Sequence, residues 1–159
     1  MAGFLSSLLD DYELEIERHR QRPFLKASMA ACALAAVADG APTLSERIRV
    51  DQILETLGAL KIFDPHEGVE LFDGYSKALL ESPQEGHQKA LEAIKAVTGN
   101  PDTAALLVRM CLAVAEAKGE KTRLDEVEIE AVCNALGVDP HEFGVYGENS
   151  SDVRLEENA

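Results

Sequence analysis

The sequence predicts an all-α fold, a single-domain bundle of about seven or eight helices. Apolar residues recur at intervals of three and four along most of the chain, and no segment alternates as a half-buried strand does. Residues that cap helix N-termini precede most of the apolar segments. The third observation is an internal repeat, because residues 32–58 align without a gap to residues 111–137. With 159 residues, 46% of them hydrophobic, the chain can bury one core without disulfide or metal support.

The first predicted element is an amphipathic helix over residues 3–20, within an N-terminal segment, residues 1–22, that precedes the domain. Acidic residues cover its polar faces, whereas a helix that lies on lipid would carry Lys or Arg there. We therefore expect its apolar stripe to pack on the domain itself rather than on a partner helix. The stripe consists of Phe4, Leu5, Leu8, Leu9, Tyr12 and Ile16.

A second helix is predicted over residues 23–38, beginning at Pro23 because proline is favoured at the first helical position. Its alanine-rich sequence lets neighbouring backbones approach closely, so we expect this helix to be central. The remaining helices are predicted over 44–58, 65–81, 83–98, 101–117 and 123–136, with a short turn from Pro140.

Capping residues mark the starts of these helices. Thr43 with Glu46, and Thr122 with Asp125, form capping boxes in which the acid three residues on reaches back to the cap amide. The other four starts have a cap followed directly by proline. These caps are Asp64, Ser82, Asn100 and Asp139.

The charge balance excludes several classes of partner. The formal net charge is −14, which repels nucleic-acid phosphates and anionic lipid surfaces. Three widely spaced cysteines suggest no disulfide framework, which favours a reducing cytoplasm. No apolar run approaches the roughly 20 residues that span a bilayer. The polar, acidic residues 146–159 are expected to be a disordered tail.

The internal repeat predicts a duplicated helix–turn–helix unit. Cys32 aligns with Cys111, Gly40 with Gly119, and both halves close with the tetrapeptide Asp-Pro-His-Glu. We assign repeat 1 to about residues 23–67 and repeat 2 to about residues 101–144. Two copies with one apolar face each can bury those faces against each other, which favours a pseudo-twofold bundle.

These motifs resemble the tellurite-resistance TerB-like helical domain over residues 23–145. They are an alanine-rich helix ending in "ADG", an acid six residues past the glycine, an apolar helix ending in "LG", and a second copy closing with "LGVDPHEF". The resemblance implies an all-helical duplicated bundle without enzymatic activity. It also implies a link to tellurite and envelope-stress systems, and a metal site at the acidic turns.

The stretch "ADGAPTLSE", residues 38–46, reproduces the second half of a calcium-binding loop. Asp39, Gly40 and Glu46 match the acid, the glycine and the bidentate glutamate of an EF-hand loop, but the first ligand positions fall on Ala35 and Val37. The alternative is a structural corner, in which Gly40 ends one helix and the Thr43–Glu46 box starts the next. Asp39 is the residue that the corner interpretation explains least well, because a negative charge in the last turn of a helix interacts unfavourably with the helix dipole.

The second turn carries Lys118 where the first has Asp39, while Asp125 keeps the position of Glu46. If the turns face each other, Lys118 could pair with Asp39 or Glu46 and replace a cation. If a cation is bound instead, the candidate metal residues are Asp39 and Glu46 of the first turn and Asp125 as a carboxylate from the other half, and the candidate ions are Ca²⁺, Mg²⁺ or Mn²⁺.

No sequence pattern indicates a catalytic centre or an organic cofactor, so we expect no enzymatic activity. The leading hypothesis is a helical module that binds other proteins of a stress-response or membrane-associated complex, and in addition a divalent cation. The alternative hypothesis is a regulatory metal sensor whose site is the Asp39–Glu46 turn.

Overall fold

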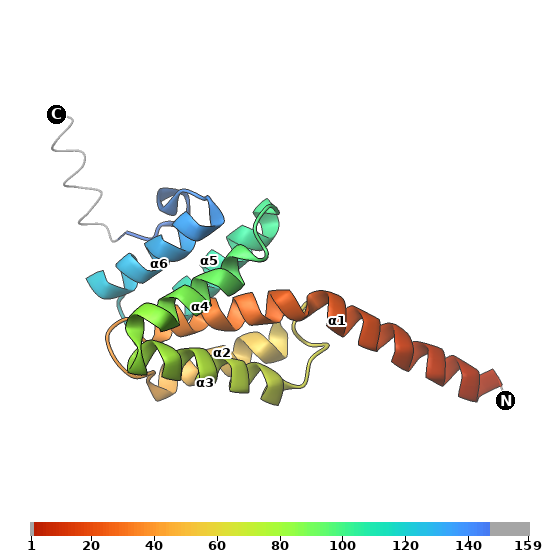
Figure 1. Cartoon of the computed structure of the whole chain (residues 1–159). Coiled ribbons are helices and arrows are strands. Elements are labelled where there is room, and N and C mark those ends of the chain that lie inside the picture. The colour runs from red at the N-terminus through yellow and green to blue at the C-terminus, as the bar shows by residue number, and fades with distance from the viewer. Residues whose placement is uncertain (1, 147–159) are drawn as a thin grey trace.

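The computed structural model describes residues 2–146, and all regular structure in that range is helical (Figure 1). This confirms the all-α prediction. The elements are α1 (Ala2–Ala36), α2 (Leu44–Thr56), α3 (Pro65–Glu81), α4 (Pro83–Lys95), α5 (Pro101–Glu116), α6 (Arg123–Leu136) and the 3₁₀ helix η1 (Pro140–Phe143). The tail expected to be disordered lies, from residue 147 on, outside the described residues.

The two helices predicted on either side of Pro23 are one continuous helix of 35 residues, so the described chain has six α-helices and not seven or eight. Proline removes the hydrogen bond to the carbonyl four residues earlier. That carbonyl belongs to His19, which is exposed and can be satisfied by water. Arg18 Nε donates to the carbonyl of Ile62 at 2.6 Å, and Arg22 Nε donates to Glu67 at 2.8 Å, which anchors the part of α1 just before Pro23 to the α2–α3 region.

The C-terminal half of α1 is the centre of the bundle, as its alanine content predicts. Nearly every residue from Phe24 to Ala36 is buried. α1 packs against α3, α4 and α5, and α6 makes a smaller contact with it. Small side chains therefore line the helix that most of the other helices surround.

α3 and α4 form a helical hairpin with a very close crossing. A Cβ atom added at Gly86 would lie 2.6 Å from both Cα and N of Leu79, so only glycine fits there. α5 and α6 form the second hairpin-like pair, and α2 contacts α3 and α5. The two turns that end α1 and α5 both lead into capped helices, α2 and α6.

The N-terminal part of α1 leaves the body instead of folding back on it (Figure 1). Every residue from Gly3 to Ile16 is exposed. The prediction that the apolar stripe packs on the domain is therefore wrong for this structure. The continuous helix is the reason, because without a turn at residues 21–22 the stripe cannot reverse direction towards the core. No helix among the described residues is long and apolar enough to cross a membrane.

Candidate functional site

The first turn is built as its sequence predicts. Gly40 adopts a positive φ of 137°, which favours glycine, and Thr43 begins α2 with a complete capping box. Glu46 Oε1 accepts from both the backbone N–H and the hydroxyl of Thr43, each at 2.9 Å. One carboxylate oxygen of Glu46 is thus committed to the cap.

The second turn repeats this geometry. Gly119 has a φ of 128°, and Asp125 Oδ2 accepts from the backbone N–H of Thr122 at 2.7 Å. The Asp125 N–H donates to the Thr122 hydroxyl at 3.1 Å, which completes the box. Asp125 therefore also keeps one oxygen free of the cap.

Lys118 joins the two turns. Its Nζ lies 2.6 Å from Asp39 Oδ2 and 3.0 Å from Asp125 Oδ1. The prediction that Lys118 pairs with Asp39 is confirmed, and its second partner is Asp125 rather than Glu46. The Asp125 side chain is fully buried and that of Lys118 is 13% exposed, whereas Asp39 is 30% exposed, so the Asp125 end of this bridge is shielded from solvent and the Asp39 end is partly open to it.

The electrostatics of the bridge favour a charged ammonium. Burial alone would lower the pKa of Lys118, but its hydrogen bonds to Asp39 and Asp125 and their negative charges outweigh that effect and raise the pKa. Asp39, which the corner interpretation left least explained, gains a defined role. It balances the positive charge that the second half of the chain contributes.

Glu46 is the unusual member of the site. It is fully buried, and within the described part of the chain its second oxygen, Oε2, has no hydrogen-bond partner. A buried carboxylate oxygen without a partner costs free energy, which makes it a place where a ligand would be favourable. No three His, Cys, Asp or Glu side chains of the described residues lie close enough together to form a metal cluster. The structure therefore brings Asp39 and Asp125 together around Lys118, but does not unite them with Glu46.

Two other contacts were not foreseen from the sequence. Arg49 Nη1 donates to the carbonyl of Ala113 at 2.9 Å and fastens α2 to α5 near the two turns. His87 of α4 lies between the Pro83 carbonyl, 2.7 Å from Nδ1, and the Glu128 carboxylate of α6, 2.9 Å from Nε2. Arg49 and Ala113 are 64 residues apart in the chain, and His87 and Glu128 are 41 apart, so no local sequence pattern could predict these contacts.

The three cysteines are buried free thiols. Burial raises the pKa of Cys32 to about 12 and that of Cys133 to about 11. Cys111 is raised well above its usual pKa, first by burial and then by the neighbouring sulfurs, and its Sγ lies 3.4 Å from the carbonyl of Ala31. Cys32 and Cys111 thus lie in the packed core where α1 meets α5, as their matched places in the repeat predict.

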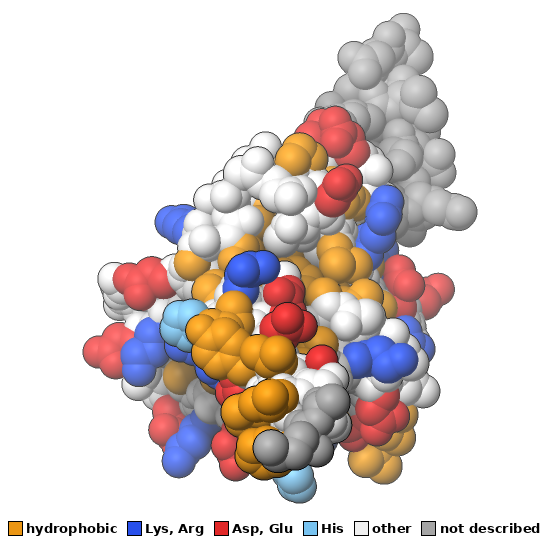
Figure 2. Space-filling model, turned by 90° about the vertical axis from the view of Figure 1, so that its right-hand side faces the viewer, with side chains coloured by type: hydrophobic (Ala, Val, Ile, Leu, Met, Phe, Trp, Pro, Cys, Tyr) orange, Lys and Arg blue, Asp and Glu red, His pale blue; other side chains and the backbone are white. Residues whose placement is uncertain are grey.

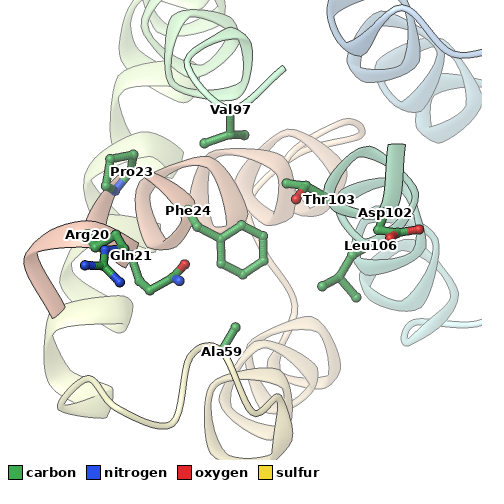
Figure 3. A pocket seen from close by; sticks show the side chains of 9 residues that line it. All are labelled: Arg20, Gln21, Pro23, Phe24, Ala59, Val97, Asp102, Thr103 and Leu106. Atoms are coloured by element: carbon green, nitrogen blue, oxygen red, sulfur yellow. The ribbon is translucent and has the colours of Figure 1, made fainter. Parts of the chain in front are cut away.

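A separate pocket of about 330 Å³ lies where α1 enters the body (Figure 3). Its walls are largely apolar, and Arg20, Gln21, Asp102 and Thr103 supply polar groups. The apolar lining residues are Pro23, Phe24, Ala59, Val97 and Leu106.

Comparison with known proteins identifies similar sequences. A family model described as "Tellurite resistance protein TerB" matches residues 25–146. A tellurium resistance protein TerB from Alcaligenes sp. is 25% identical over 108 residues, which cover 68% of this chain and 88% of that protein. No solved structure matches the chain. Both turns lie inside the range of the family match, and residues 2–24 precede it.

Proposed function

The chain belongs to the TerB family of tellurite resistance proteins, and we propose that it is a non-enzymatic helical module that acts in the stress response by binding other proteins. The observation that carries this proposal is the exposed apolar face of α1. A stripe of six large apolar side chains, each 42–73% exposed, stands away from the body on a regular helix. Amphipathic helices of this kind are a common recognition element between proteins.

The experiment is complementation of tellurite resistance in cells that lack the chain. Leu8→Lys and Leu9→Lys change the apolar stripe without touching the core, since both residues are more than half exposed. Leu14→Lys is the matched control, because Leu14 lies on the opposite side of the helix. We expect growth on tellurite to fail for the stripe variants and to persist for the control. Full resistance from every variant would contradict partner binding through α1.

The second candidate function is divalent-cation sensing at Asp39, Glu46 and Asp125, supported by the buried, unpartnered Oε2 of Glu46. Carboxylate oxygens suit Ca²⁺, Mg²⁺ and Mn²⁺. Lys118 now holds the position between Asp39 and Asp125, so a cation would have to displace its ammonium group. Such a displacement would break the link between the two turns, which is how ion binding would alter the exposed surface.

We interpret the two turns as copies of one duplicated helix–turn–helix unit, repeat 1 over about residues 23–67 and repeat 2 over about residues 101–144. The matched positive-φ glycines and matched capping boxes support this interpretation. The domain plan that follows is an N-terminal helix over residues 1–22, the TerB-like domain over residues 23–145, and an acidic tail. The three buried free thiols favour the cytoplasm as its compartment.

A further inference from the structure

The segment that carries the inference is the α1 extension, which we define as residues 3–16. Every residue in it is exposed, and it continues the central helix outward from the body (Figure 1). In the view along that direction, hydrophobic side chains gather on the helix that points towards the viewer (Figure 2). With roughly 200 Å² for each fully exposed large side chain, the six exposed fractions of the stripe amount to about 700 Å². That area is close to the roughly 800 Å² that each partner contributes to a standard protein interface.

Four side chains of the stripe form a row along the extension, which we call the seam. They are Leu5, Leu9, Tyr12 and Ile16, and they are 42–64% exposed. Their alternating spacings of four and three residues keep them on one side of a helix, and this is the spacing at which one helix packs along another. The seam therefore favours a helix as its occupant.

Acidic side chains border the seam on both edges. At about 100° per residue, Glu13 lies on one edge, and Asp11 and Glu15 lie on the other. The extension contains these acids and Asp10, and it contains neither Lys nor Arg. Glu15 forms an ion pair with Arg18 of the same chain, whereas the other three acids have no ion-pair partner among the described residues. Negative charge beside the seam is therefore available to a partner.

These charges distinguish between the classes of occupant. Biological membrane surfaces are anionic, and helices that lie on them carry basic residues on the polar face. A second copy of the extension would bring the same acids against each other, because the segment contains no base to meet them. A helix of another protein that carries Lys or Arg beside its own apolar row complements both the seam and its acidic borders.

The seam leads to the pocket at the base of the extension. The same spacing continued from Ile16 gives His19 and Pro23, which are both exposed, and Pro23 lines the pocket. Leu5 and Pro23 are 18 residues apart, or about 27 Å along a helix, which a partner helix of about five turns covers. The end of such a helix can place an apolar side chain in the pocket, over the ring of Phe24 (Figure 3).

We propose that the α1 extension binds a basic amphipathic helix of another protein, which lies along the seam with its Lys and Arg side chains beside Glu13 and Glu15 and ends at the pocket. The inference rests on the proposed function, since it names the chemistry of the partner that the stripe binds. Arg20 and Arg22, near the pocket, are each paired with an acid of the same chain. Their charges are therefore balanced and do little to oppose a basic partner there.

Fluorescence anisotropy with two synthetic peptides tests the charge of the partner. Both peptides have three heptads with Leu at positions a and d, and they differ only at e and g, where one carries Lys and the other Glu. Like charges at e and g oppose the self-association of each peptide. At about 0.15 M salt, we expect the full chain to bind the Lys peptide at least about tenfold more tightly than the Glu peptide. Equal affinities, or a preference for the Glu peptide, would overturn the proposal.

A matched pair of variants tests whether the peptide lies on the seam. Leu9→Lys changes the seam and Leu14→Lys the opposite side of the helix, and both change the net charge by the same amount. Leu9→Lys should raise the dissociation constant of the Lys peptide about tenfold or more, as when an interface hot spot is lost, and Leu14→Lys less than about twofold. Circular dichroism is expected to show folded helices in both variants, since both positions are solvent-exposed. Equal losses would indicate general attraction to an acidic protein and overturn binding on the seam.

A second matched pair tests the acidic border. Glu13→Lys reverses a charge beside the seam, and Asp10→Lys makes the same reversal on the far side of the helix. Glu13→Lys should weaken binding of the Lys peptide about fivefold or more, whereas Asp10→Lys should change it less than about twofold, because salt screens the more distant charge. The same effect from both variants would contradict recognition of the border.

The outcomes separate this inference from the proposed function. If the parent chain binds neither peptide but Leu9→Lys abolishes tellurite resistance, the inference fails and the proposed function stands. If the Lys peptide binds on the seam but Leu9→Lys still protects cells, the inference stands and the proposed function fails. A parent mass of twice 17.2 kDa that Leu9→Lys halves would assign the seam to a second copy, and cosedimentation with neutral phosphatidylcholine vesicles would assign it to lipid. Either result overturns the proposal.

Discussion

Lys118 Nζ and Asp39 Oδ2 are 2.6 Å apart, although the residues are separated by 79 positions in the chain. They occupy equivalent places in the internal repeat, since residue 32 aligns with residue 111 and residue 39 with residue 118. One half contributes a carboxylate and the other an ammonium group. The contact therefore joins the two turns through opposite charges. An acid at both equivalent positions would instead place two negative charges side by side, and they would repel.

The first prediction is that Lys118→Met lowers the free energy of unfolding by about 1–3 kcal/mol. Methionine keeps the length of the side chain but leaves the fully buried Asp125 beside Asp39 without the cation. Urea denaturation at pH 7 measures the change. Lys89→Met, at an exposed position of α4, is the control and should change stability by less than about 0.5 kcal/mol. Equal losses in both variants would contradict a stabilising role of the bridge.

The local features of the fold could be predicted from the sequence because a few neighbouring residues determine them. The capping boxes at Thr43 and Thr122 and the glycines at the two turns have the geometry that their sequence signals indicate. The contact between Lys118 and Asp39 was also foreseeable, because the repeat places the two residues at equivalent positions. The alignment of the two halves of the chain thus suggested a contact between residues 79 positions apart, which no local sequence motif could do.

The features that were not predicted depend on context. A proline usually begins or breaks a helix, but here the carbonyl that Pro23 leaves unpaired is at an exposed residue, and Arg18 and Arg22 just before Pro23 are anchored to the α2–α3 region. The amphipathic pattern of residues 4–16 correctly indicates a helix, yet the pattern does not state which surface its apolar face contacts. Likewise, the burial of Glu46 follows from the packing of α2 against its neighbours and not from the sequence around it.

The second prediction concerns the crossing of α3 and α4. Gly86→Ala should destabilise the protein by about 1–3 kcal/mol, because the new Cβ would meet the backbone of Leu79 at 2.6 Å. Gly74→Ala in α3 is the matched control, since a Cβ there meets nothing within 4 Å. That control should gain about 0.5–1 kcal/mol from the higher helix propensity of alanine. Thermal denaturation of both variants checks the difference in sign.

The third prediction is a pH-dependent contribution from His87. Burial lowers its pKa, but the Pro83 carbonyl and the Glu128 carboxylate outweigh that effect and raise the pKa above 6.5. A raised folded-state pKa stabilises the protein fully below the unfolded pKa, and this stabilisation is lost as pH rises through the folded pKa. His87→Gln should therefore cost more at pH 5.5 than at pH 9, by less than about 1 kcal/mol for this partly exposed pair.

Urea midpoints at the two pH values measure this effect, with the exposed His19→Gln as the control. A His87→Gln penalty that is larger at pH 9 would show that the imidazolium does not stabilise the contact between α4 and α6.

The fourth prediction is that the native protein reacts very slowly with bulky thiol reagents at pH 8. All three cysteines are buried, and burial raises the pKa of each thiol, so little thiolate is present and access is blocked. In denaturant three thiols should react at once. A Ser7→Cys variant, at an exposed position, should show one additional fast thiol in the native state. Rapid reaction of more than that one thiol would contradict the packing of α1 against α5.

The last prediction concerns the candidate cation site, and it follows from the competition between an ion and Lys118. The parent chain should bind Ca²⁺, Mg²⁺ or Mn²⁺ weakly, because the ion must displace an ammonium group held by two carboxylates. Lys118→Asp removes that competitor and adds a carboxylate, so it should bind more tightly. An ion at a hundredfold excess over its dissociation constant stabilises the folded state by about 2.7 kcal/mol.

For a domain of this size that gain raises the melting temperature by roughly 5–11 °C. Asp39→Asn and Glu46→Gln, each combined with Lys118→Asp, should remove most of the shift, and glutamine can still serve in the capping box at position 46. The measurement is a melting curve in millimolar Ca²⁺, Mg²⁺ and Mn²⁺, with chelator as the reference. If neither the parent nor Lys118→Asp shifts with any of the three ions, Asp39, Glu46 and Asp125 form a structural corner and not a metal site.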